Sequence, residues 1–226
     1  MSKLQHRFGP LAGLAFAVLY AAFTLTPLME LPEGAYSDQR VIALYADAGS
    51  RTGIVVGGLI VGLAGVVLLV FLADLRRRLA DGAADATLPS LAFGAGLIYV
   101  VMLFVAGNAW AGYATGIAVG ELPAPQDATL LRVLSDSGFG LLLIYGLLAA
   151  AALVLATSLC ARRTDLLPTS LIKSGYVIAP LLCLGFAWVP QFLLPLWVAA
   201  VSIAFLRQRP EAPLVTADGS LSSLAT

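Results

Sequence analysis

The sequence predicts an all-α membrane protein: a polytopic bundle of six transmembrane helices with both termini in the cytoplasm. Hydrophobic residues make up 60% of the 226 residues and charged residues only 12%, whereas a soluble domain carries about one quarter charged residues. Five long segments contain no charged residue, and each is long enough to cross a hydrocarbon core of about 30 Å as a helix. No strand-length alternation appears, so the pattern favours a helical bundle over a barrel.

The last uncharged segment predicts two short helices instead of one. It covers 33 residues, 174–206, and contains Pro180, Pro190 and Pro195. Proline removes a backbone donor and clashes with the preceding turn, so we expect the chain to reverse at Val189-Pro190-Gln191. One broken helix and an odd number of spans is the alternative. The expected bundle occupies residues 1–209, with spans at about 8–29, 52–73, 91–114, 137–161, 174–189 and 192–206.

The distribution of basic residues favours six spans over five. Six spans place ten Lys and Arg residues in the cytoplasm and three outside, whereas five spans give eight against five. The ten are Lys3, Arg7, Arg76, Arg77, Arg78, Arg162, Arg163, Lys173, Arg207 and Arg209, and the three are Arg40, Arg51 and Arg132. A cell-membrane protein with both termini inside follows. Residues 210–226 show no periodicity and are expected to form a mobile tail.

A short amphipathic helix is expected on the outer side, between the first two spans. Ser37 is a suitable N-cap, and Val41, Leu44, Tyr45 and Ala48 then share one face. We expect this helix to act as an interfacial support, with a lid as the alternative.

The residue inventory excludes several kinds of chemistry. His6 is the only histidine, and the only lysines, Lys3 and Lys173, sit at the membrane ends. Axial haem ligands, histidine-based catalytic sites and a retinal Schiff base in mid-bundle are therefore not expected. We predict no catalytic residue, metal site or cofactor. No nucleic-acid partner is expected either.

Glycines recur at four-residue spacing along three helix faces. The pairs are Gly53 with Gly57 and Gly58 with Gly62, and the series is Gly112, Gly116 and Gly120. Such faces let a second helix approach closely, so we interpret them as packing surfaces inside the bundle, with a dimer interface as the alternative.

Asn108 is an amide in one of the most apolar parts of the chain, one turn before Gly112. An amide in hydrocarbon costs several kcal/mol without partners, so it must bond to another helix, to water or to a ligand. The structural role is a hydrogen bond between helices, and the functional role is contact with a ligand.

Other polar residues are expected at the same outer level, which predicts a cavity that opens outward. Arg132 and Asp136 are four residues apart, so they form either an interfacial ion pair or a charged mouth above that cavity. The inner half is poorer, and its tyrosines, such as Tyr99, are expected to be interfacial anchors. The candidate ligand-binding residues are Asn108, Asp136, Arg132, Tyr145, Tyr20, Thr24, Arg51, Trp188 and Gln191.

Three stretches carry a resemblance to a known family. They are VIALYADAGSRTGIVVGGLIVGLAGVVLLVFLADLRRRL, LRVLSDSGFGLLLIYG and FLLPLWVAAVSIAFL. The chain resembles, over most of residues 8–207, an uncharacterised family of bacterial six-helix integral membrane proteins that is described as a domain of unknown function. This resemblance implies the architecture alone, because the family brings no substrate, cofactor or catalytic residue.

Two functional hypotheses follow. The first is a non-enzymatic membrane protein that binds a lipid-like or small apolar ligand, or a membrane partner, through the outward-facing cavity. Besides membrane lipids, its partners would include a second copy or another membrane protein. The alternative is a small secondary transporter in which Asp136 is the coupling group, because burial raises the pKa of a carboxyl. A membrane enzyme ranks last, since no nucleophile and base stand out.

Overall fold

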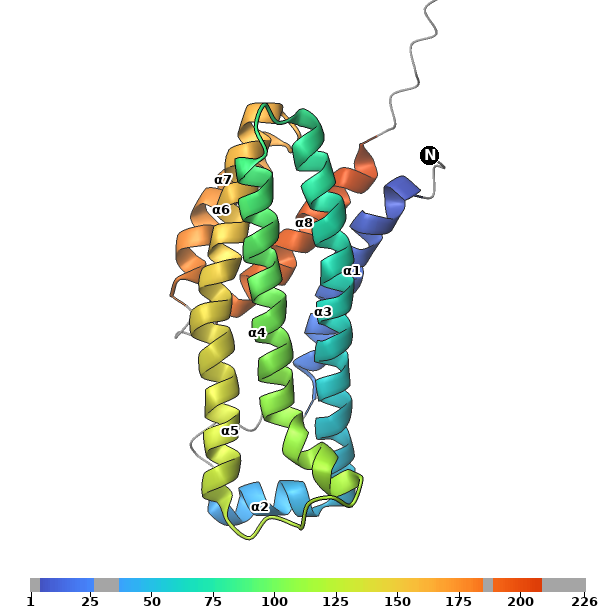
Figure 1. Cartoon of the computed structure of the whole chain (residues 1–226), viewed down its shortest axis with the longest axis vertical. Coiled ribbons are helices and arrows are strands. Elements are labelled where there is room, and N and C mark those ends of the chain that lie inside the picture. Colours follow the sequence, from blue (N-terminus) through green and yellow to red (C-terminus); the bar gives the residue numbers. More distant parts are fainter. Residues whose placement is uncertain (1–4, 27–36, 185–188, 209–226) are drawn as a thin grey trace, which may run out of the picture.

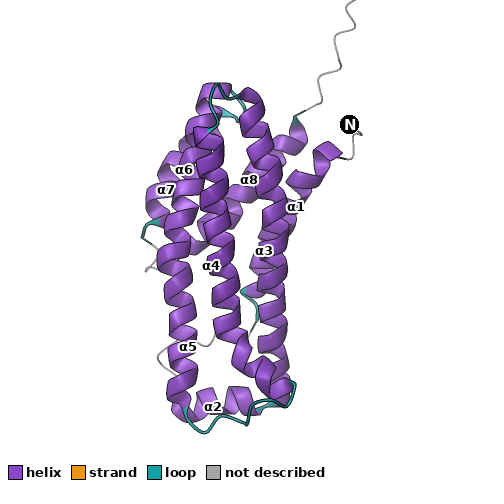
Figure 2. Cartoon of the chain, viewed as in Figure 1, coloured by secondary structure: helices purple, strands orange, loops and turns teal. Residues whose placement is uncertain are grey.

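The computed structural model describes residues 5–26, 37–184 and 189–208, and throughout these ranges the regular structure is helical (Figure 2). The all-α prediction is therefore confirmed. The elements are α1 (Gln5–Phe23), α2 (Asp38–Ala46), α3 (Ala48–Gly82), α4 (Thr87–Ala118), α5 (Ala128–Gly140), η2 (Leu141–Gly146), α6 (Leu147–Thr164), α7 (Thr169–Leu182), η4 (Val189–Phe192) and α8 (Leu193–Arg207).

Four helices are long and apolar enough to cross a membrane. They cover Ala48–Gly82, Thr87–Ala118, Ala128–Thr164 and Val189–Arg207, and two shorter apolar helices cover Arg7–Phe23 and Thr169–Leu182. At about 1.5 Å per residue, the 14 residues of α7 extend about 21 Å, less than the hydrocarbon thickness. The structure thus confirms several candidate spans, whereas the count of six stays a prediction. The expected tail, 210–226, lies outside the described residues.

The three longest helical segments run along the whole bundle, and the others cover parts of it (Figure 1). α3, α4 and the continuous segment α5–η2–α6 stand side by side. α1, α7 and α8 pack beside one half of their length, and α2 lies across the end of the other half. The last uncharged segment forms two helices, as predicted, but the break lies earlier than expected: α7 ends at Leu182, and η4, in which Pro190 and Gln191 are buried, leads directly into α8.

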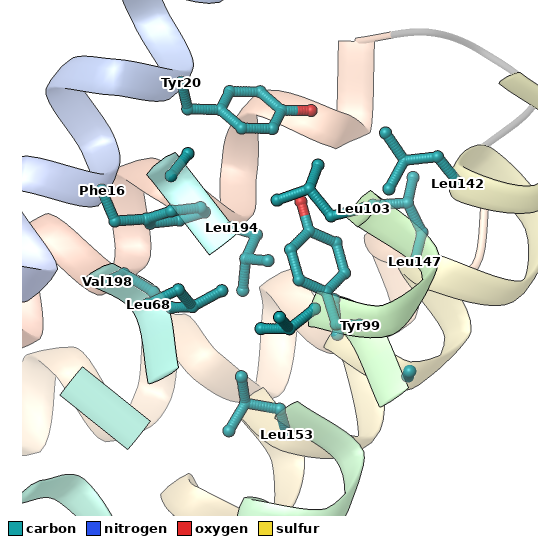
Figure 3. Close-up of a cluster of buried hydrophobic side chains, with 14 of the residues drawn as sticks. Phe16, Tyr20, Leu68, Tyr99, Leu103, Leu142, Leu147, Leu153, Leu194 and Val198 are labelled. Carbon is teal, nitrogen blue, oxygen red and sulfur yellow. The ribbon is translucent and has the colours of Figure 1, made fainter. Parts of the chain in front are cut away.

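The segment α5–η2–α6 contains one irregular turn. Its six residues Leu141–Gly146 form a π-helix, a rare conformation that frequently lies at functional sites. η2 packs against α4, and Leu142 of η2 and Leu147 of α6 lie beside Leu103 and Tyr99 of α4 (Figure 3).

Trp110 joins three helices in the core. Its fully buried ring stacks on Phe23 of α1 at 5.5 Å between centroids and contacts Phe139 of α5 at 4.5 Å. Its Nε1 donates a hydrogen bond of 3.2 Å to the Ser135 carbonyl oxygen. Gly138 makes this approach possible, because a Cβ there would lie only 2.6 Å from Nε1.

α2 confirms the expected amphipathic connector. The Ser37 side chain accepts a hydrogen bond from the Arg40 amide, and Val41, Leu44 and Tyr45 are buried. Ala48, which the sequence placed on the same face, begins α3 instead and is exposed. The Tyr45 hydroxyl donates to the Trp110 carbonyl oxygen at 3.4 Å, and burial raises the pKa of Tyr45 to about 12. The helix is thus fastened over the end of the bundle.

The described basic residues divide eight to three between the two ends of the bundle. The end that holds both described chain ends (Figure 1) carries Arg7, Arg76, Arg77, Arg78, Arg162, Arg163, Lys173 and Arg207; the other end carries Arg40, Arg51 and Arg132. We call the first the basic end. Its arginines are partly fixed, because Asp74 pairs with Arg77 at 2.5 Å and with Arg78 at 2.7 Å.

Candidate functional site

The structure does not gather the eight candidate residues that it describes into one outward-facing cavity. Tyr20 and Gln191 are in direct contact, Arg132 and Arg51 hold α2, and Asn108 faces a groove elsewhere on the bundle. Trp188 lies outside the described residues. Thr24 donates its hydroxyl hydrogen bond to the Ala21 carbonyl oxygen of its own helix end, and Tyr145 is exposed on η2.

The expected pairing of Arg132 with Asp136 is replaced by a contact between helices. Arg132 of α5 forms an ion pair of 3.1 Å with Asp38, in the first turn of α2, whereas Asp136 is exposed. At the other end of α2, Arg51 donates hydrogen bonds of 3.1 and 3.3 Å to the carbonyl oxygens of Tyr45 and Ala46. A helix carries a partial positive charge at its N-terminus and a partial negative charge at its C-terminus. An acidic group at the first and a cation at the second therefore stabilise α2.

A buried polar cluster lies deep in the bundle and consists of Tyr20, Tyr99 and Gln191. The Tyr20 hydroxyl donates to Gln191 Oε1 at 3.2 Å. The Tyr99 hydroxyl points to the side on which Tyr20 lies, amid Leu103, Leu142 and Leu194 (Figure 3). Tyr99 is fully buried, which corrects its expected role as an interfacial anchor. Within the described residues, neither its hydroxyl nor Gln191 Nε2 makes a hydrogen bond of good geometry, although the hydroxyls of Tyr99 and Tyr20 are close enough to interact.

The two tyrosines of this cluster should respond differently to loss of the hydroxyl. We expect Tyr20→Phe to lower the free energy of unfolding by about 1 kcal/mol, because it also leaves Gln191 Oε1 unpaired. Tyr99→Phe should change it by less than about 0.5 kcal/mol or raise it, because that buried hydroxyl makes no hydrogen bond of good geometry. Thermal unfolding of both variants in the same detergent measures the difference. Equal losses for the two variants would contradict this assignment.

Asn108 lies on the surface of α4, not in the core. Ala106, Gly107, Trp110 and Ala111 of α4 face the bundle, whereas Asn108 is exposed. It lines a groove of about 360 Å³ between α3 and α4, which we call the Asn108 groove. Among the other residues that line this groove are Gly58, Leu59, Gly62, Phe104, Gly112 and Thr115.

Small residues create the groove because they bring α3 and α4 close together. A Cβ on Gly58 would lie 2.5 Å from the Ala111 Cβ, and one on Gly107 would lie 3.0 Å from Val61. Gly58 therefore packs inside the bundle, as the glycine spacing predicted. Gly62 is different, because a Cβ there would meet nothing within 4 Å. The floor of the groove at Gly62 is open to the surroundings.

Asn108 lies near the middle of an uncharged segment, where a bilayer around the bundle would hold little water. It is five residues from the midpoint of the uncharged segment 86–120, which corresponds to about 7.5 Å along the helix axis, well inside a hydrocarbon core about 30 Å thick. Its Oδ1 lies 3.3 Å from where a Gly112 Cβ would be, so the side chain leans over Gly112. No hydrogen-bond partner for the amide occurs in the described part of the chain. The amide is therefore available to water, to a ligand or to a second chain.

Fold and groove together define the class of this protein: a helical bundle with helices able to cross a membrane and a polar group on a small-residue groove between two of them. Comparison with protein-family models, with curated proteins and with solved structures finds no match. The resemblance to a bacterial membrane-protein family therefore stays a prediction.

Proposed function

We propose that this chain is a non-enzymatic integral protein of the cell membrane that docks a transmembrane helix of a second copy of itself in the Asn108 groove. In this proposal six helical segments lie in the bilayer, with the basic end and both termini in the cytoplasm. The observation that carries the proposal is Asn108, an exposed and unpaired amide above an open glycine floor between two apolar helices.

The chemistry of the amide favours a helix as the occupant over a lipid chain. Asn108 offers two N–H donors and one carbonyl acceptor, and an acyl chain satisfies none of them. A second Asn108, related by a two-fold axis, can accept from the first and donate to it, as an isologous interface requires. The glycines allow the helix backbones to approach closely, which increases van der Waals contact, the main attraction between helices in lipid.

The groove also has ridges that a second copy can offer in return. Leu59 of α3 and Phe104 of α4 line the groove; Leu59 is 63% exposed, and Phe104, whose ring packs over Gly65, is 38% exposed. In a two-fold arrangement the ridge of one copy enters the groove of the other. The transporter alternative has no comparable support, because its coupling residue, Asp136, is on the exposed face of α5.

Association in lipid vesicles tests this function. Energy transfer between donor-labelled and acceptor-labelled copies measures the dissociation constant of the dimer. We expect Asn108→Leu to raise that constant by about 3- to 30-fold, because interhelical hydrogen bonds contribute about 0.6–2 kcal/mol. Tyr145→Phe is the matched control, since it removes an exposed polar group away from the groove. Unchanged association in Asn108→Leu would overturn the proposal. If the unchanged protein retains lipid during purification and Asn108→Leu does not, the groove binds a lipid-like ligand instead.

A further inference from the structure

A second groove, separate from the Asn108 groove, lies between α7 and α8 at the basic end. Its volume is about 470 Å³. Leu171 of α7 and Ala200, Ile203 and Ala204 of α8 supply its apolar walls, while Arg207 and Ser170 supply its polar part. We call it the α7–α8 groove. The two alanines leave space that larger side chains would fill.

The polar part of this groove carries an uncompensated positive charge. Arg207 is exposed, and within residues 5–26, 37–184 and 189–208 no carboxylate lies within ion-pair distance of its guanidinium. Its neighbour Gln208 is fixed by a hydrogen bond of 2.7 Å from Nε2 to the Leu166 carbonyl oxygen, which ties the end of α8 to the segment before α7. The wider surroundings also have a net positive charge. Among the described residues, this end carries eight basic residues against four acidic ones, Asp74, Asp81, Asp85 and Asp165.

We propose that the α7–α8 groove binds one anionic phospholipid, with its phosphate at Arg207 and Ser170 and an acyl chain along Ala200 and Ile203. The order of groups along the groove matches the order of groups in such a lipid. Ser170 precedes the uncharged segment 174–206 and Arg207 follows it, so both lie at the level expected for headgroups. The alanine-lined wall continues into that segment. Basic pockets between transmembrane helices bind anionic headgroups for this reason.

The charge selects the lipid class. A phosphodiester without a cationic headgroup places its full negative charge on the guanidinium, which can bind two phosphate oxygens at once. A phosphatidylcholine headgroup brings a positive choline to the same place, where Arg207 and the other basic residues repel it.

Lipid titration of the purified, delipidated protein, followed by native mass spectrometry, tests this site. We expect the first phosphatidylglycerol to bind at least tenfold more tightly than phosphatidylcholine with the same acyl chains. Arg207→Gln should weaken phosphatidylglycerol binding about tenfold, and Ala204→Phe should weaken it by filling the apolar wall without changing charge. Arg162→Gln, at the same end but outside the groove, is the matched control and should bind like the unchanged protein.

Equal affinity for the two lipids, equal losses in Arg207→Gln and Arg162→Gln, or no effect of Ala204→Phe would each overturn the proposal. Displacement of the lipid by millimolar inorganic phosphate would also overturn it, because that result indicates a site for the anion alone. Both groove substitutions are on partly or fully exposed positions, so unchanged thermal unfolding will show that the variants are folded.

Discussion

Replacing Trp110 with alanine should lower the free energy of unfolding by about 3–5 kcal/mol, the usual cost of removing a fully buried large aromatic side chain. The loss is expected at the upper end because one ring contacts both Phe23 and Phe139. The cavity would open between α1, α4 and α5, and the Ser135 carbonyl oxygen would lose its hydrogen bond from Nε1. Reversible unfolding in mixed micelles measures this free energy.

One further variant separates the packing of Trp110 from its hydrogen bond, and a second is a control at an exposed ring. Trp110→Phe retains a ring against Phe23 and should cost clearly less than Trp110→Ala. Phe8→Ala removes an aromatic ring that is 66% exposed and should change the free energy of unfolding by less than about 0.5 kcal/mol. If Trp110→Ala cost less than 1 kcal/mol, Trp110 would not be the residue that joins these helices.

Placing a leucine at Gly62 should abolish self-association without destabilising the fold. A leucine there would occupy the floor of the Asn108 groove, which a second copy needs, while it meets no atom of its own chain at the Cβ. Leucine also favours a helix over glycine by about 0.5–1 kcal/mol, so thermal unfolding should be unchanged or slightly improved. Energy transfer between labelled copies in vesicles should fall at least tenfold.

Gly94→Leu is the matched control for this experiment. Gly94 lies in α4 and, like Gly62, has nothing within 4 Å of where its Cβ would be, but it is not among the residues that line the Asn108 groove. We expect Gly94→Leu to associate like the unchanged protein. Equal association of the Gly62 and Gly94 variants would show that the groove is not the interface.

Features set by local sequence could be predicted well. Uncharged segments locate the long helices, because charges are costly in hydrocarbon whatever surrounds them. Ser37 caps α2, because capping acts over a few residues, and the proline-containing segment 174–206 is divided into two helices, although α7 ends at Leu182 and not at Pro190. The sequence predicts Tyr20 and Gln191 at one level of the bundle, and in the structure the Tyr20 hydroxyl donates a hydrogen bond to Gln191 Oε1.

Features set by helix rotation and by distant partners could not be predicted. In α4 both the core face and the outer face are apolar, so the sequence does not reveal that Trp110 faces inward and Asn108 outward. Arg132 has a nearby carboxylate in Asp136, yet it pairs with Asp38, which is 94 residues away in the chain. That choice depends on where α2 lies. The burial of Tyr99 likewise depends on residues distant in the chain, among them Leu142 of η2, Leu147 of α6 and Leu194 of α8.

Cysteine cross-linking in lipid vesicles tests the central claim, that the Asn108 groove docks a second copy, most directly. Asn108→Cys is introduced together with Cys160→Ala and Cys183→Ala, which remove the two native thiols. A disulfide needs Cα atoms within about 7 Å, so it reports direct contact across the proposed two-fold axis. We predict a covalent dimer on mild oxidation, and none for Tyr145→Cys in the same background. If Asn108→Cys stays monomeric, or both variants cross-link equally, the proposed docking site is wrong.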